Sequence, residues 1–246
     1  YAADDLSALT KILFQQYDQL MSAGEDAAAE KLLKEAAARF QKFLDNHPDR
    51  VEVRDSLIRI QTNLREYPPA LGNVEILIAQ RPDLGSLHQW KGQLLLLSRQ
   101  FEDAERSYRR AMKLEPKRAT AILVEFGQAL NFSDRPEQAA AIAREAKKLD
   151  PQSDGPLQLT AEIAFRSENY GDWEKGLRAA ISAHPKSRIL HNTLINGLLK
   201  LQKLDKAYEE FMVLEKAEPD NSACVQWLIE LAPHLTFPIN PQPHVD

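Results

Sequence analysis

The side chains that most often do chemistry are sparse and scattered along this chain. Its 246 residues include six histidines and a single cysteine, Cys224. A zinc site needs several such ligands at close spacing, but no His-Glu-x-x-His, Cys-x-x-Cys or glycine-rich phosphate-binding pattern is present. His88 and His191 lie at equivalent places in the repeat described below, 103 residues apart, so they form no local metal site. We therefore expect no metal, no cofactor and no catalytic group, with Cys224 as an inert buried thiol.

Composition and charge narrow the class of protein. The chain is 43% apolar and 27% charged, which is typical of a soluble folded protein and too apolar for a disordered one. Its net charge of −5 argues against a nucleic-acid binder, which usually carries a basic excess. One cysteine excludes a disulfide framework within the chain, and no apolar run is long enough to cross a membrane. With only 9 glycines, the chain favours helices over a turn-rich β-structure.

Any site must be positioned by a repeating element, which the prolines reveal. They recur at intervals of 34 or 35 residues: Pro48, Pro82, Pro116, Pro151, Pro185 and Pro219. Because proline cannot continue a helix, each marks the end of one. Twelve residues before each proline stands an alanine in five cases and Trp173 in the sixth, and twenty-four residues before three of them stand Gly92, Gly127 and Ala161. Small residues at a fixed position predict close contact between two helices.

Each repeat contains two amphipathic stretches. In residues 85–118 the apolar positions of the first stretch are Leu87, Trp90, Leu94 and Leu97, and those of the second are Phe101, Ala104, Tyr108, Ala111 and Leu114. Both sets have helical spacing, and a short polar turn at 98–100 separates them. The repeat is therefore predicted to be a helical hairpin, with Phe40, Tyr108 and Phe211, each eight residues before a proline, in its core.

This pattern resembles the tetratricopeptide repeat family over about residues 17–221, as six units. The residues that carry the resemblance are Gly92, Phe101, Ala104, Tyr108, Ala111 and Pro116, followed by Gly127, Ala139, Ala146 and Pro151. The resemblance implies an all-α fold, a right-handed superhelical solenoid of stacked antiparallel helix pairs with a concave inner surface. Trp173 departs from the pattern, so its repeat is expected to splay or shift, and Ile58 and Ile195 replace the small residue of the first helix.

The solenoid is expected to span residues 1–232. Stretches 4–23 and 25–45 are predicted to be N-terminal helices, and residues 222–232 are predicted to be a C-terminal capping helix, because the end of a stack must be covered. The remaining residues 233–246 hold four prolines and are predicted to be extended. This tail is interpreted as a linker, or alternatively as a strap that folds back through Leu235, Phe237 and Ile239.

The resemblance implies that the first helix of each hairpin lines the concave groove. Positions 27, 23, and 20 or 19 before each proline share one helical face. The candidate partner-binding residues on it are Asp55, Arg59, Gln89, Gln93, Gln128, Asn131, Phe132, Glu162, Phe165, Arg166, Asn192 and Asn196, with Thr62, Asn63, Leu96, Val124, Gln158 and Lys200 at the same positions. Amides can pair with an extended peptide backbone, and Leu96, Phe132 and Phe165 are expected to receive apolar side chains. The alternative is that this polar face only meets water.

These features predict a non-catalytic scaffold that binds an extended peptide or partner protein on its concave face. The chaperone tails bound by some family members are not expected, because Asp55 and Arg59 stand where a lysine and an asparagine would be needed. The alternative function is a module that positions substrate within a larger enzyme, or within a secretion or assembly complex. The chain begins at Tyr1 rather than at methionine, so we expect that a preceding segment was removed. The cytoplasm is favoured, and export is the alternative if that segment was a signal peptide.

Overall fold

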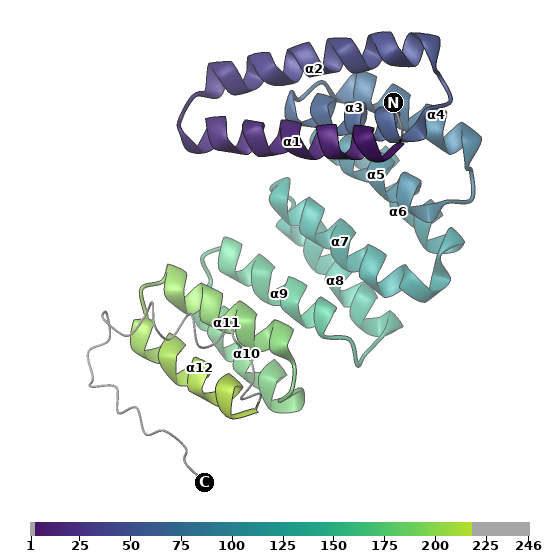
Figure 1. Ribbon diagram of the computed structural model, residues 1–246. Helices are drawn as coiled ribbons and strands as arrows, with labels where there is room; N and C mark the ends of the chain where they lie inside the picture. Colours follow the sequence, from purple (N-terminus) through teal and green to yellow (C-terminus); the bar gives the residue numbers. More distant parts are fainter. Residues whose placement is uncertain (1–2, 218–246) are drawn as a thin grey trace. The chain divides into compact units, whose positions relative to one another are not determined.

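The computed structural model describes residues 3–217, and every regular element within that range is helical (Figure 1). The elements are α1 (Ala3–Ser22), α2 (Asp26–Asn46), α3 (Val51–Asn63), α4 (Tyr67–Gln80), α5 (Gly85–Leu97), α6 (Phe101–Leu114), the 3-10 turn η1 (Pro116–Arg118), α7 (Ala119–Phe132), α8 (Pro136–Leu149), α9 (Asp154–Arg166), α10 (Tyr170–Ala183), α11 (Arg188–Lys200) and α12 (Leu204–Ala217). They follow one another as six helical hairpins, which confirms the all-α prediction. The predicted capping helix 222–232, the tail 233–246 and Cys224 lie outside the described residues.

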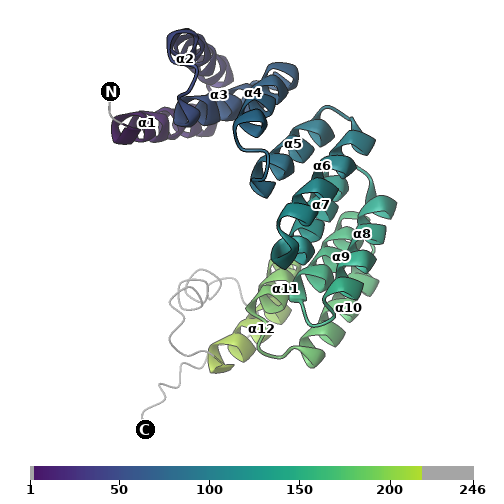
Figure 2. The same ribbon diagram turned by 90° about the vertical axis from the view of Figure 1, so that its right-hand side faces the viewer.

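The chain divides into two compact units, residues 1–122 and residues 123–246. We call them unit 1 and unit 2. Unit 1 contains α1 to α6, unit 2 contains α8 to α12, and the boundary falls within α7. Within unit 2, α9 and α11 lie side by side, as first helices of successive hairpins do in a stack (Figure 2). The right-handed superhelix stays a prediction.

The prolines set the ends of the second helices, as their spacing predicts. The helices α2, α4, α6, α8 and α10 each end two residues before a proline of the repeat. The predicted N-terminal helices also form, as α1 and α2. Proline lacks a backbone N–H and restricts the residue before it, so the helix cannot run through. The proline spacing therefore fixes where each hairpin ends.

The turn between the two helices of each hairpin has a shared backbone conformation that the sequence did not predict. Its second residue has a positive φ of 57–60° in five hairpins, at Arg65, Arg99, Asp134, Glu168 and Gln202. In the α5–α6 turn, Gln100 N–H donates to the Leu95 carbonyl oxygen at 2.8 Å and Arg99 N–H donates to Leu96 at 2.9 Å. This is the pattern of a Schellman helix end, where glycine is usual. A larger side chain there carries strain, which the hydrogen bonds offset.

Small residues do lie where helices approach most closely. A Cβ built on Gly92 of α5 would lie 2.7 Å from the Tyr108 ring of α6, and Tyr108 is fully buried. The alanines at 70, 104, 139 and 207 are completely buried as well. The predicted helix contact is therefore confirmed at these positions, whereas Ala36 is only half-buried. The core role of Tyr108 and Phe211 is confirmed as well, while Phe40 is half-buried against the cluster of Leu44, Val53 and Leu57.

Trp173 is accommodated by a glycine outside the expected phase. Its side chain is 1% exposed and packs with Ala161, Leu177 and Leu194 in the core of unit 2. A Cβ built on Gly197 of α11 would lie 2.6 Å from Cη2 of the indole and closer still to Cζ2. The space that Trp173 occupies therefore depends on the missing side chain of Gly197, a compensation that the expectation of a splayed or shifted repeat did not include.

Candidate functional site

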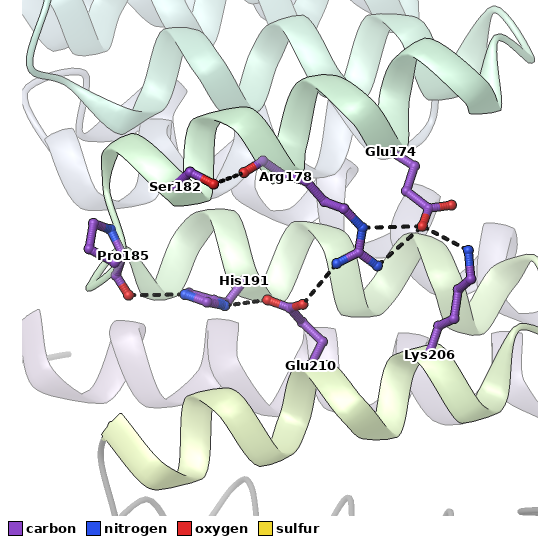
Figure 3. A network of polar contacts seen from close by, with 7 residues as sticks. All are labelled: Glu174, Arg178, Ser182, Pro185, His191, Lys206 and Glu210. Atoms are coloured by element: carbon purple, nitrogen blue, oxygen red, sulfur yellow. Dashed lines mark hydrogen bonds and ion pairs between the residues drawn. The ribbon is translucent and has the colours of Figure 1, made fainter.

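A network of polar contacts joins α10, α11 and α12 in unit 2 (Figure 3). His191 is 2% exposed, and its Nδ1 lies 2.5 Å from the Glu210 carboxylate. Its Nε2 lies 3.1 Å from the carbonyl oxygen of Pro185, in the turn that precedes α11. Both ring nitrogens therefore face an oxygen of the fold. The arrangement fixes the turn to α11 and joins α11 to α12.

Glu174 of α10 lies at the other end of this network. Its carboxylate accepts hydrogen bonds from Lys206 at 3.0 Å, Arg178 at 3.1 Å and Lys203 at 3.3 Å. Burial alone would raise the pKa of Glu174, but the hydrogen bonds from Lys206, Arg178 and Lys203 outweigh it and lower the pKa to about 2. A carboxylate with so low a pKa is a weak base at neutral pH. Glu174 therefore ties α10 to α12 electrostatically.

The contact from the first helix to the turn proline recurs at the same position in three hairpins. Arg54 Nη2 donates to the Pro48 carbonyl oxygen at 2.8 Å, and His88 Nε2 lies 3.2 Å from that of Pro82. Arg54 is buried and donates also to Asn73 Oδ1 at 2.7 Å, and burial lowers the pKa of its guanidinium. His88 and His191, which occupy equivalent positions in the repeat, thus make the same contact, and this contact fixes the turn to the first helix.

Residues 3–217 contain no cluster of three or more His, Cys, Asp or Glu side chains that could hold a metal ion. Within the same residues, no helix combines the length and the apolar character needed to span a membrane.

The face that the first helices present in unit 2 has a connected set of side chains. We call it the unit 2 face; its residues are Gln128, Asn131 and Phe132 of α7, Gln158, Glu162, Phe165 and Arg166 of α9, and Asn192, Asn196 and Lys200 of α11. Gln128 Nε2 donates to Glu162 Oε2 at 3.1 Å, and Gln158 Nε2 donates to Glu162 Oε1 at 2.8 Å. Gln128 and Glu162 are 34 residues apart, so equivalent positions of successive repeats touch each other.

Two cations of the unit 2 face lie over aromatic rings of a neighbouring first helix. The Arg166 guanidinium lies 5.7 Å from the centre of the Phe132 ring, and Lys200 Nζ lies 5.8 Å from that of Phe165. Arg166 also donates to Asp134 at 2.8 Å. Phe132 is 75% exposed although it lies on a helix, whereas Phe165 is half-buried against Tyr170 and Trp173. Such pairs contribute about 0.5–1 kcal/mol each at exposed sites.

One step along a helix separates buried from exposed positions of this face. The position 20 residues before the proline is buried at Leu96 and Asn131, whereas the next position is exposed at Leu97 and Phe132. A rotation of about 100° per residue explains the difference. Leu96 is therefore a core residue and not an apolar anchor, and Leu97 does not belong to the buried stripe of α5.

The remaining candidate partner-binding residues lie in unit 1. In unit 1, Gln89 is buried and Gln93 is exposed on α5. Asp55 accepts from Arg59 at 3.1 Å, and both line a hollow of about 680 Å³ between α3 and α1. Phe14 of α1 contributes to this hollow. The sequence pattern did not place α1 in the face, because α2 has 21 residues where the other second helices of the repeat have 14, so the fixed offsets from Pro48 fall at or beyond the end of α1.

Comparisons with known proteins bear on the fold. No protein-family model matches the chain, and no curated protein does. Among solved structures, the match to yeast Tom70 covers 84% of this chain and 41% of Tom70, with 18% identity and a TM-score of 0.50. The match to a tetratricopeptide repeat protein from Parabacteroides merdae covers 92% of this chain and 87% of that protein, with 16% identity and a TM-score of 0.49.

The chain has the tetratricopeptide repeat fold. The hairpins of 34 or 35 residues and the Tom70 match agree on this, and the resemblance seen in the sequence is confirmed. At this level of identity the likeness concerns the fold alone. What a tetratricopeptide repeat chain binds must be argued from its own side chains.

Proposed function

We propose that this tetratricopeptide repeat chain is a protein-interaction scaffold whose unit 2 face binds an extended segment of a partner protein. The observation that carries the proposal is Phe132, a large apolar ring that is 75% exposed on a helix and held beneath Arg166. Covering an exposed ring removes apolar surface from water, and aromatic and arginine side chains are enriched among residues that dominate binding. The ring and the cation together offer an anchor for an apolar side chain.

The polar residues of α11 suit an extended chain. Asn192 and Asn196 are exposed and make no hydrogen bond within the described residues. They are four residues apart, so about 6 Å separates them along the helix axis. In an extended chain, backbone groups that point the same way recur about 6.6 Å apart, every second residue. Each amide carries donors and an acceptor, so the two can pair with successive backbone groups of the same segment.

The test uses peptides selected from a random display library against the whole chain. Their dissociation constants are measured by calorimetry for the parent, for Phe132→Ala, and for Leu149→Ala as a control. Leu149 is also more than half exposed but lies at the end of α8, outside the unit 2 face. We expect Phe132→Ala to weaken binding about tenfold or more, and Leu149→Ala to leave it unchanged. Peptides that bind Phe132→Ala as tightly as the parent would place the site elsewhere.

A further inference from the structure

The most basic stretch of the chain lies on α6 and η1 in unit 1. Residues 106–118 hold six cationic side chains and one acid, a net charge of +5 within a chain whose net charge is −5. The rest of the chain therefore carries −10. A concentration of charge opposite in sign to the rest of the protein attracts acidic ligands selectively.

Three of these cations share one face of α6. Arg106, Arg110 and Lys113 are spaced by four and three residues, so they form one row along the helix. We call them the basic stripe, and all three are exposed. Lys113 also lies in the last turn, where a cation interacts favourably with the helix dipole. Arg106 and Arg110 lie before that turn, so the dipole does not account for them.

Much of the positive charge here is not neutralised. Arg106 pairs with Asp103, but Arg110 and Lys113 have no carboxylate partner among the described residues, and neither does Lys117 in η1. Exposed cations are hydrated by water, so the lack of a carboxylate partner does not destabilise the fold. It leaves them available to an acidic ligand.

The stripe stands between two hollows of the surface. One, of about 420 Å³, is lined by α4, α5 and α6, including Arg106, Arg110 and Lys91. Its acids are already paired, since Glu75 accepts from Lys91 at 2.9 Å and Asp103 pairs with Arg106. The other, of about 530 Å³, is lined by α6 residues that include Arg106, Arg110 and Lys113. A carboxylate that enters the first hollow meets Arg110 without competition from a carboxylate of the protein.

We infer that the basic stripe and its two hollows form a second docking surface, which binds an acidic segment of a partner protein. Glu102 lies one turn before Arg106 in the same row of α6, and Glu105 lies beside the stripe, paired with Arg109 at 3.2 Å. A nucleic-acid backbone or an anionic membrane presents negative charge continuously and would meet these acids as well. A peptide can place carboxylates along the stripe and uncharged residues beside the acids.

The inference is tested with a labelled decaglutamate peptide and the whole chain at low salt, by fluorescence anisotropy. The stripe variant carries Arg110→Glu and Lys113→Glu. The control carries Lys147→Glu and Lys148→Glu, two exposed cations in the last turn of α8 that make no ion pair or hydrogen bond within residues 3–217. Both variants change the net charge equally, so long-range repulsion is matched. We expect binding that weakens with salt, a loss of about tenfold or more in the stripe variant, and a change of less than about threefold in the control.

Three results would overturn the inference. They are the absence of decaglutamate binding by the parent, an equal loss in both variants, and tighter binding to phosphatidylserine vesicles or oligothymidylate than to decaglutamate. Circular dichroism establishes that each variant is folded. Phe132→Ala is expected to bind decaglutamate like the parent, so this surface and the unit 2 face can fail independently.

Discussion

The contact between Trp173 and Gly197 predicts opposite outcomes for the same substitution at two glycines of unit 2. Gly197→Ala places a methyl group against the buried indole of Trp173, closer than any ordinary carbon contact. Gly176→Ala in α10 is the control, because a Cβ built there meets nothing within 4 Å. Both glycines lie inside helices, so both substitutions change the intrinsic helix propensity alike.

The expected size follows from two opposing contributions. Replacing glycine by alanine within a helix stabilises by about 1 kcal/mol. Overpacking of a core costs about 1–3 kcal/mol, and the upper end applies here because the ring of Trp173 is rigid and almost fully enclosed. Gly197→Ala should therefore lower the free energy of unfolding by about 2 kcal/mol, whereas Gly176→Ala should raise it by about 1 kcal/mol.

The assay is urea denaturation followed by circular dichroism, with tryptophan fluorescence as a second probe. A third variant, Trp173→Leu, removes most of the ring. In that background Gly197→Ala should become neutral or stabilising, and the difference between the two backgrounds measures the coupling directly. A Gly197→Ala variant as stable as the parent, or a penalty that persists without the indole, would refute the proposed contact.

Two further predictions concern charge and backbone strain. Since the pKa of Glu174 is about 2 in the folded chain and 4.5 ordinarily, its contribution to stability is present above pH 4.5 and is lost as the pH falls toward 2. Glu174→Gln should therefore make the unfolding free energy fall less steeply between pH 5 and pH 3 than it does in the parent. The free energy is measured by denaturant titration at each pH, and an equally steep fall in both proteins would contradict this. Arg99→Gly relieves a residue with a φ of 60° and should stabilise by about 0.5–1 kcal/mol. Arg81→Gly is the control, since Arg81 has a φ of −139° and gains nothing from glycine, so this variant should lose stability. Thermal denaturation measures both variants, and a gain in stability at both positions would point to a cause other than the turn conformation.

The repeat was predictable because it depends on local chemistry. A proline cannot continue a helix beyond the first turn, so the six prolines of the repeat were enough to place the hairpins and to give the phase of Gly92 and Ala104. The face of the first helices was only partly predictable. Asn131 and Phe132 are neighbours in sequence and both belong to the face, yet Asn131 is buried and Phe132 is exposed, because the boundary between the buried and the exposed side of α7 falls between them.

Other features depend on contacts that no fixed spacing records. Gly197 lies two residues from the small-residue position, which Ile195 occupies, so its relation to Trp173 appears only in three dimensions. The positive φ at Arg99 was missed because the residue type argues against it; the hydrogen bonds of the turn impose the conformation. The network of His191 and Glu210 joins residues 19 apart, and nothing in the sequence distinguishes Glu210 from other acids on helix surfaces.

The hydrogen bonds that Glu162 accepts from Gln128 and Gln158 have a consequence for kinetics. Three long side chains are held in one arrangement before any ligand arrives, so little rotamer entropy remains to be lost at encounter. On the proposed function, a surface prepared in this way should associate with different partner segments at similar rates. Their affinities would then differ mainly in how long each complex lasts.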